Sequence, residues 1–171
     1  MFIYCTPNLS VMTNLRCGHT NMYHYFDLIP YSSTGYTIQD WGEHHNPIVI
    51  LRNPLDRVVS AEKKTVNRYI NNSRREMIFI EHSRPYMHAI LAYDFRIIDF
   101  YDFVQYIPRR SELTQSYRTD SRVGDNITPQ DIHVENSEYT LQELQQEFET
   151  YKELMMTQEK ITVSEWKELT K

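Results

Sequence analysis

The feature that most constrains the fold is an uninterrupted apolar run, Ile48-Val49-Ile50-Leu51, which ends at Arg52-Asn53-Pro54. A β-branched run without alternating polar residues is typical of a parallel strand that is covered on both faces. Residues 55–70 then place apolar side chains on one helical stripe, and proline is well suited to the first position of a helix. This segment therefore predicts a buried strand, a short loop and a helix.

A second unit of this kind lies earlier in the chain. Phe2-Ile3-Tyr4-Cys5 is a short apolar run that predicts a strand, and after a polar loop residues 20–28 place apolar side chains at helical spacing. The chain thus contains two successive units of strand, loop and helix, which is the βαβ pattern. We therefore expect an α/β protein with three layers, in which helices flank a parallel sheet.

The later half of the chain predicts four more elements. Residues 99–107 read as a short helix, residues 131–135 as a short strand and residues 164–169 as a final helix. Residues 140–143 form a capping box that opens a longer helix. The residues expected on its inner face are Leu141, Leu144, Phe148, Tyr151 and Met155. Residues 71–98 are compatible with either helix or strand.

Composition narrows the class of protein. The chain has 171 residues, 40% of them hydrophobic and 24% charged, which fits one globular domain over residues 1–171 and argues against disorder. Its longest apolar stretches, such as residues 89–93, are far shorter than the roughly 20 residues that span a bilayer. Two cysteines cannot build a disulfide framework. We therefore expect no membrane partner and a cytoplasmic location, or the host cytoplasm if the source is viral.

Charge is unevenly distributed. The formal net charge of -5 disfavours general nucleic-acid binding, which usually needs a basic excess. Residues 52–75 nevertheless hold seven basic against two acidic side chains, whereas residues 135–171 hold nine glutamates against four lysines. The basic middle can face a phosphorylated ligand while the acidic end is solvated.

The first predicted strand-to-helix junction contains Arg16-Cys17-Gly18-His19-Thr20-Asn21. A glycine followed by threonine and asparagine at a helix start offers backbone N–H groups, a hydroxyl group and the positive end of the helix dipole. Arg16 adds a permanent charge that can bind phosphate or sulfate oxygens in a fork. The alternative interpretation is an ordinary helix cap beside a solvated arginine.

The second junction contains Arg52 at the end of the predicted buried strand, which is the carboxyl edge where open α/β sheets bind ligands. Arg57 and Ser60 are three residues apart and share a helical face. Arg52 and Ser60 can together hold one phosphate, by charge and by hydroxyl group. The alternative is a capped helix with surface arginines.

Taken together, the two junctions resemble the sulfotransferase family, whose donor is 3′-phosphoadenosine 5′-phosphosulfate. The family's first motif, usually Lys-x-Gly-Thr-Thr, holds the 5′-phosphosulfate, and the second, usually Arg-Asp-Pro-x-x-Arg-x-x-Ser, holds the 3′-phosphate. Here the first motif is matched by Arg16, Gly18 and Thr20, with Asn21 at its usual serine. The second is matched by Arg52, Pro54, Arg57 and Ser60. The departures are Arg16 for lysine, His19 for threonine and Asn53 for aspartate.

The resemblance implies a P-loop-like sulfotransferase fold and a soluble enzyme that needs no metal. Such an enzyme would transfer a sulfuryl group to a hydroxyl or amine of an unknown acceptor, such as a carbohydrate, a small molecule or a peptide, and would release adenosine 3′,5′-bisphosphate. Arg122 either closes over the 3′-phosphate or belongs to a surface loop. The residues expected to bind the donor are Arg16, Cys17, Gly18, His19, Thr20, Asn21, Arg52, Ser60 and Arg122.

Catalysis needs charge stabilisation at the leaving phosphate and a general base for the acceptor. The resemblance assigns the first role to Arg16. In relatives the general base is a histidine or glutamate that often lies between the two motifs. This favours Glu43, His44 and His45 as candidate bases. This cluster lies at the amino end of its strand, opposite the donor edge unless the chain folds back, and it can instead be a surface turn. His82 is a further candidate base.

Two other functions stay open at this point. A relative that binds the nucleotide without turnover would share both motifs. A P-loop-type nucleotide kinase would need Gly-x-x-x-x-Gly-Lys-Ser/Thr at the first junction. The only glycines are Gly18, Gly35, Gly42 and Gly124, and they do not form that motif.

Overall fold

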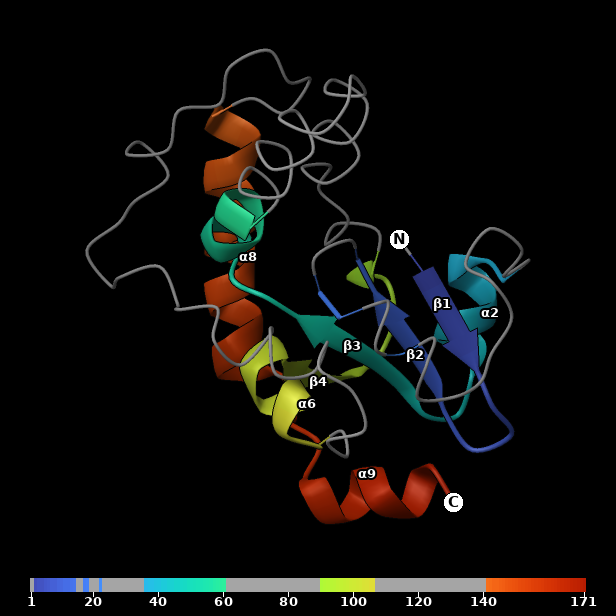
Figure 1. Ribbon diagram of the computed structural model, residues 1–171. Coiled ribbons are helices and arrows are strands. Elements are labelled where there is room, and N and C mark those ends of the chain that lie inside the picture. The colour runs from blue at the N-terminus through green and yellow to red at the C-terminus, as the bar shows by residue number, and fades with distance from the viewer. Residues whose placement is uncertain (1, 15–16, 19–21, 23–35, 61–89, 107–140) are drawn as a thin grey trace, which may run out of the picture.

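The computed structural model describes residues 2–14, 17–18, 22, 36–60, 90–106 and 141–171. Their strands form one sheet in the order β1-β2-β3-β4 (Figure 1). β1 is antiparallel to β2, whereas β2, β3 and β4 run parallel. The α/β class is confirmed, but a wholly parallel sheet is wrong, because β1 and β2 form a hairpin. The strands are β1 (Phe2–Cys5), β2 (Ser10–Thr13), β3 (Pro47–Leu51) and β4 (Arg96–Asp99).

The sequence pattern predicts a polar loop and not a strand where β2 lies. All four residues of this strand are buried. Its polar side chains have nearby partners: Ser10 Oγ lies 3.1 Å from Cys5 Sγ, and Thr13 Oγ1 donates a 2.6 Å hydrogen bond to the Cys17 carbonyl. A hydroxyl group that is hydrogen-bonded can be buried at low cost. Polar residues at both ends of a short strand therefore do not indicate a loop.

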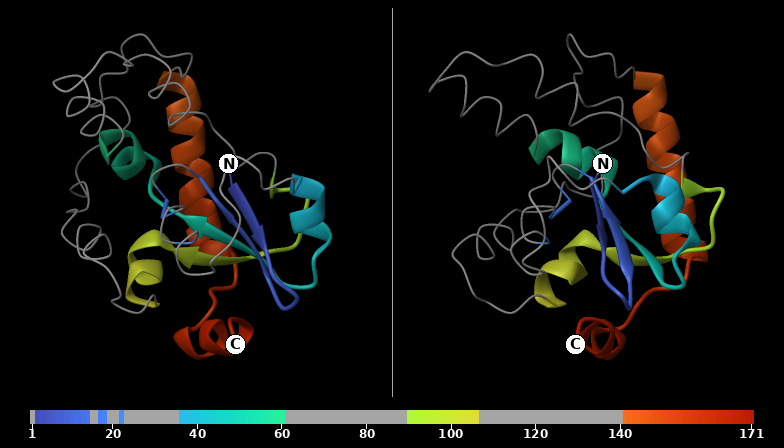
Figure 2. Two further views of the ribbon diagram at one scale, coloured as in Figure 1. Left: turned by 45° about the vertical axis from the view of Figure 1, so that its right-hand side comes forward. Right: turned by 90° about the vertical axis from the view of Figure 1, so that its right-hand side faces the viewer.

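The predicted central strand, β3, is buried on both faces as expected. Ile48 and Ile50 belong to a core on one side of the sheet, which also contains Phe103 of α6 and Trp166 of α9. Val49 and Leu51 belong to a second core on the other side, with Trp41 of α2 and Leu154 of α8. Figure 2 shows α6 on one side of the sheet and α2 and α8 on the other. The described residues therefore form three layers. These helices are α2 (Ile38–Glu43), α6 (Phe100–Tyr106), α8 (Leu141–Thr157) and α9 (Val163–Leu169).

The helices expected at residues 99–107 and 164–169 are confirmed as α6 and α9. Residues 54–60 are helical, as expected for the start of the predicted helix 55–70. Of the predicted helix at 20–28, only Met22 is among the described residues, and it is helical; the predicted strand at 131–135 lies outside them. None of the helices in the described ranges is long and apolar enough to cross a bilayer.

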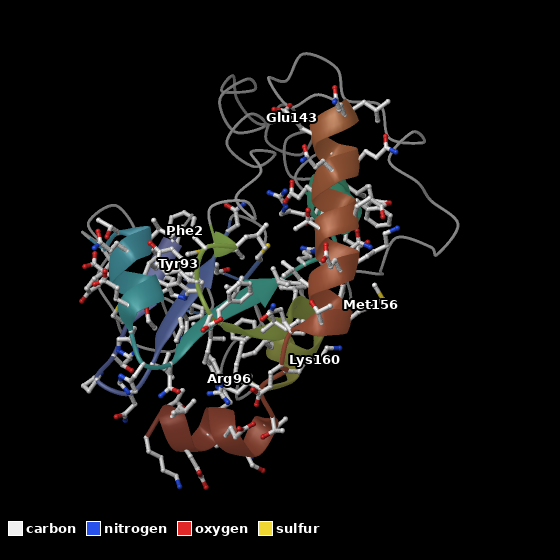
Figure 3. All side chains as sticks on the ribbon, turned by 180° about the vertical axis from the view of Figure 1, so that it is seen from behind. Phe2, Tyr93, Arg96, Glu143, Met156 and Lys160 are labelled. Atoms are coloured by element: carbon white, nitrogen blue, oxygen red, sulfur yellow. The ribbon has the colours of Figure 1, made fainter. Side chains whose placement is uncertain are left out.

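The long helix α8 differs from its predicted inner face in three positions. Leu144 is buried and Phe148, Tyr151 and Met155 pack against the cores, as expected. Leu141 is 42% exposed, and Figure 3 shows that the end of α8 marked by Glu143 extends beyond the sheet. The pattern missed two buried positions, Leu154 and Glu147. Glu147 was not expected inside because an acidic residue is rarely buried without a charged partner.

That partner is Arg57 of the helix at residues 54–60. Arg57 Nη2 donates a 2.6 Å hydrogen bond to Glu147 Oε1, and the two side chains are 1% and 0% exposed. Leu144 packs beside this ion pair against Leu55 and Val58. The pair therefore joins α8 to the helix that follows Arg52.

The Glu147→Gln variant should lower the free energy of unfolding by about 3 kcal/mol, because it leaves the Arg57 charge buried without its carboxylate. Urea unfolding followed by circular dichroism measures this loss. Glu149→Gln is the matched control on the same helix, since its ion pair with Lys152 is exposed and should contribute no more than about 0.5 kcal/mol. Equal losses in the two variants would contradict a structural role for the buried pair.

Candidate functional site

The three parallel strands end at the same edge of the sheet. Met12 of β2 is in register with Val49 of β3, and Leu51 of β3 is in register with Asp99 of β4. The segments that follow these strands therefore emerge side by side. We call this region the carboxyl edge; its described residues are Asn14, Cys17 and Gly18 after β2, Arg52 and residues 53–60 after β3, and residues 100–106 after β4.

The first junction follows β2 and not the strand Phe2–Cys5 from which the sequence led us to expect it. The reason is that β1 turns back through the hairpin, so the chain enters the junction from β2. Cys17 is buried, and its backbone N–H donates to the Asn14 carbonyl at 3.0 Å. The Gly18 carbonyl accepts from the N–H of Met22 at 3.0 Å, as in the first turn of a helix. Arg16, His19, Thr20 and Asn21 lie outside the described residues.

Gly18 is required by its backbone and by its neighbour. Its φ is 84°, in the left-handed region that other residues rarely adopt. A Cβ atom at this position would lie 2.8 Å from Cε1 of Phe103 and 3.6 Å from Cε2 of Phe100. The glycine of the first motif therefore lets the turn approach the aromatic side chains of α6 closely.

The two junctions are electrostatically coupled. Burial raises the pKa of the Cys17 thiol, and the charges of Arg57 and Arg52 oppose that rise. Both arginines are therefore close enough to act on a residue of the first junction. The structure places Cys17, Gly18 and Arg52 at one edge of the sheet, whereas Ser60 is the last described residue of the helix that follows Arg52.

The second junction is a capped helix, but its arginines are buried. The Asn53 side chain caps the helix, with Oδ1 accepting from the N–H of Leu55 at 2.9 Å, and its carbonyl accepts from the N–H of Arg57 at 3.0 Å. Arg52 is 2% exposed and Ser60 is 4% exposed. The alternative of surface arginines is therefore wrong, since Arg57 is bound to Glu147 and Arg52 lies against aromatic rings.

Two aromatic residues at the start of α6 lie against Arg52. Its guanidinium carbon lies 4.4 Å from the centre of the Phe100 ring and 5.7 Å from that of Tyr101. Nη2 donates a long hydrogen bond of 3.5 Å to the Tyr101 hydroxyl oxygen. The Tyr101 hydroxyl in turn donates to Asp56 Oδ2 at 3.1 Å. Burial raises the pKa of this tyrosine, which keeps the hydroxyl group protonated as a donor.

Sequence reasoning did not identify Asp56, Tyr101 or Asp99 as site residues. Asp99 ends β4, and its Oδ1 accepts from the N–H of Tyr101 at 2.9 Å, which fixes the start of α6. A strand ending in an acidic residue directly before a helix was the available signal. It was not usable, because residues 96–98 of β4 belong to the segment 71–98, for which the pattern leaves helix and strand open, and Asp99 was predicted as the first residue of a helix.

The predicted base cluster lies at the opposite end of β3. Glu43 ends α2, and His44 and His45 immediately precede the strand. A five-residue strand is about 16 Å long, so the structure does not bring this cluster to the carboxyl edge. Arg122 and His82 lie outside the described residues.

His44 instead links the β1–β2 turn to the start of β3. Its Nε2 lies 3.1 Å from the Thr6 carbonyl oxygen, and its Nδ1 accepts from the N–H of Asn46 at 3.3 Å. The ring of His45 stacks on it with 4.4 Å between centres. These two bonds require the neutral imidazole with its proton on Nε2. Burial, as the largest cause, lowers the pKa of His44, and the hydrogen bond to Thr6 opposes the change.

Replacing Gly18 by alanine should lower the free energy of unfolding by about 2 kcal/mol or more, because both the positive φ and the Phe103 contact oppose a side chain. Thermal or urea unfolding measures the effect. In a Phe103→Leu background the loss of unfolding free energy caused by Gly18→Ala should be smaller, since only the strain of the positive φ remains. A fully stable Gly18→Ala variant would show that the turn tolerates a side chain.

His44 should make stability depend on pH below neutrality. Its folded pKa is lower than the unfolded value of about 6.5, so the unfolded chain binds more protons and stability is lost as pH falls below 6.5. His44→Asn, which keeps an acceptor group, should flatten the change in unfolding free energy between pH 7.5 and pH 5.5. The His45→Asn variant should keep most of this change in unfolding free energy. An unchanged slope in His44→Asn would assign the dependence to another group.

Comparisons with known proteins add no relative to this description. No family model, no curated protein and no solved structure matches the chain. The functional assignment therefore depends on the two junctions at the carboxyl edge and on the chemistry of their side chains.

Proposed function

We propose that this protein binds 3′-phosphoadenosine 5′-phosphosulfate at the carboxyl edge and transfers its sulfuryl group to a hydroxyl or amine of a carbohydrate, small molecule or peptide. One observation carries the proposal: β2 and β3 are neighbouring parallel strands, and each motif directly follows one of them. The ligand has two anionic ends, and adjacent cationic turns suit such a molecule.

Each part of the edge has a role in this proposal. Arg52 and Ser60 bind the 3′-phosphate, because a guanidinium group donates in a fork and a hydroxyl group adds a further donor. The turn at Cys17 and Gly18, with Arg16 before it, binds the 5′-phosphosulfate. Arg57 has a structural role instead, since its guanidinium is held by Glu147.

In the transfer step the acceptor oxygen or nitrogen forms a bond to sulfur while the bond from sulfur to the 5′-phosphate oxygen breaks. The electron pair of the broken bond stays on the leaving phosphate, where Arg16 and backbone N–H groups stabilise the developing charge. The proton of the acceptor passes to a general base. Positioning and electrostatics supply most of the rate, as in phosphoryl transfer.

Burial of Arg52 has a consequence for binding. Because its side chain is 2% exposed, the atoms that cover it have to move apart when the nucleotide enters. Once bound, a phosphate would meet the guanidinium in a region of low dielectric, where a charge-assisted hydrogen bond is strong.

A second function, nucleotide binding without turnover, is favoured by the position of the base cluster. Glu43, His44 and His45 lie at the amino end of β3, and His44 is engaged by Thr6 and Asn46. They are therefore poor bases for a reaction at the carboxyl edge. Product formation from labelled donor, with sugars, phenols and peptides as acceptors, separates the enzyme from the binding protein.

Arg52→Ala should reduce the affinity for adenosine 3′,5′-bisphosphate at least about tenfold, because a charge-assisted phosphate contact is lost. Calorimetric titration measures this change, and a thermal-shift series with the bisphosphate, AMP and ATP measures selectivity. Arg96→Ala is the matched control: Arg96 pairs with Glu165 at 3.1 Å and lies beside α9 (Figure 3).

The control variant should bind the bisphosphate as the unmodified protein does. An unchanged affinity in Arg52→Ala would remove this residue from the site. Equal stabilisation of the unmodified protein by ATP and by the bisphosphate would favour the nucleotide kinase class over both proposals.

A further inference from the structure

α6 contacts both junctions of the carboxyl edge. Phe103 lies against the Gly18 turn, and Phe100 lies between that turn and Arg52, at ring-contact distance from each. Tyr101 reaches Arg52 through its hydroxyl group. A single short helix therefore supplies side chains to both of the segments that the proposed function assigns to the nucleotide.

We propose that Phe100 and Tyr101 are positioning residues that hold the Arg52 guanidinium and thereby determine the preference for a nucleotide with a 3′-phosphate. The inference rests on the proposed function and names the residues that make its second motif selective. Neither residue touches the nucleotide; both act through Arg52.

The ring of Phe100 fixes the plane of the guanidinium. The distance of 4.4 Å from the guanidinium carbon to the ring centre is within the range of a cation–π contact, which is stronger in a desolvated site. Phe100 is itself fully buried in the core that contains Ile50 and Ile98. Its ring therefore offers a rigid surface for a side chain that would otherwise sample many rotamers.

The hydroxyl group of Tyr101 fixes the direction of one guanidinium nitrogen. Because this hydroxyl donates its proton to Asp56 at 3.1 Å, its oxygen lone pairs remain to accept from Arg52 Nη2 at 3.5 Å. The backbone of Tyr101 is held by Asp99 at 2.9 Å. The tyrosine is thus anchored at its main chain and at its hydroxyl group, on two different aspartates.

Tyr101→Phe is the cleanest test, because it removes one oxygen and leaves the net charge unchanged. Substitution of Asp56 would also remove a negative charge near the phosphate and so alter affinity directly. The experiment measures the affinities for adenosine 3′,5′-bisphosphate and for AMP by calorimetry. Tyr101→Phe should lower the affinity for the bisphosphate by about fivefold to tenfold and leave that for AMP unchanged.

The matched control is Tyr93→Phe, which removes a tyrosine hydroxyl group on the other side of the sheet, where the Tyr93 ring packs edge-to-face on Trp41. Its preference for the bisphosphate should equal that of the unmodified protein. In an Arg52→Ala background, Tyr101→Phe should cause no further loss, because its effect passes through Arg52. Phe100→Leu keeps an apolar side chain but removes the ring face, and it should lower the same preference.

The outcomes separate this inference from the function on which it rests. If the unmodified protein does not prefer the bisphosphate over AMP, the proposed function fails and the inference with it. If the preference exists and survives in both Tyr101→Phe and Phe100→Leu, the inference alone is overturned. An equal loss of affinity for both nucleotides would also overturn it, since that would indicate a general structural role.

Discussion

Parallel pairing of β2 with β3 is the constraint on which the rest of the structure depends. Parallel strands place their carboxyl ends at one edge, so the segments after Thr13 and Leu51 meet although 38 residues separate the strand ends in the sequence. An antiparallel arrangement would send one junction to each end of the sheet. The hairpin formed by β1 makes this possible, because it reverses the chain before β2 begins.

The carboxyl edge contains two buried guanidinium groups that are accommodated differently. Arg57 is neutralised by Glu147 of α8, an ion pair whose partners are 90 residues apart. Arg52 lies on the face of Phe100 and meets the Tyr101 hydroxyl group. The first arrangement satisfies the charge within the protein and suits a structural role. The second includes a cation–π contact with an aromatic face and a hydrogen bond to a neutral hydroxyl group.

Prediction from sequence succeeded where a pattern has one physical cause. The run at residues 48–51 can only be buried on both faces, and it is. Pro54 indicates a helix start, and residues 54–60 are helical. The strands β2 and β4 were not predicted because, unlike the wholly apolar four-residue strand β1, each is a short strand with a polar residue at both ends. In β2, moreover, the buried hydroxyl groups of Ser10 and Thr13 resemble those of a loop.

Of the two junctions, the second was located correctly after an apolar run, whereas the first was assigned to the wrong strand, since it follows β2 and not β1. Within the first junction, Gly18 has the positive φ that a tight turn requires. The aromatic neighbours of Arg52 could not be predicted, because Phe100 and Tyr101 lie almost 50 residues away in the sequence. Asp56 lies only one helical turn from Arg52, but its role depends on its hydrogen bond with Tyr101. The predicted base cluster shows that closeness in sequence is not enough. His44 and His45 lie near β3 in the sequence, but at its amino end and therefore away from the carboxyl edge.

Local chemistry alone therefore determined which segments of this protein are strands buried on both faces, which residues cap helices and which turns carry charge. These properties depend on side chains within a few positions of one another. Only the tertiary structure decided which charged groups meet, that β1 is antiparallel to β2 and that Arg57 pairs with Glu147 of α8. Those outcomes depend on strand pairing and on burial against distant residues, and neither leaves a periodic signal in the chain.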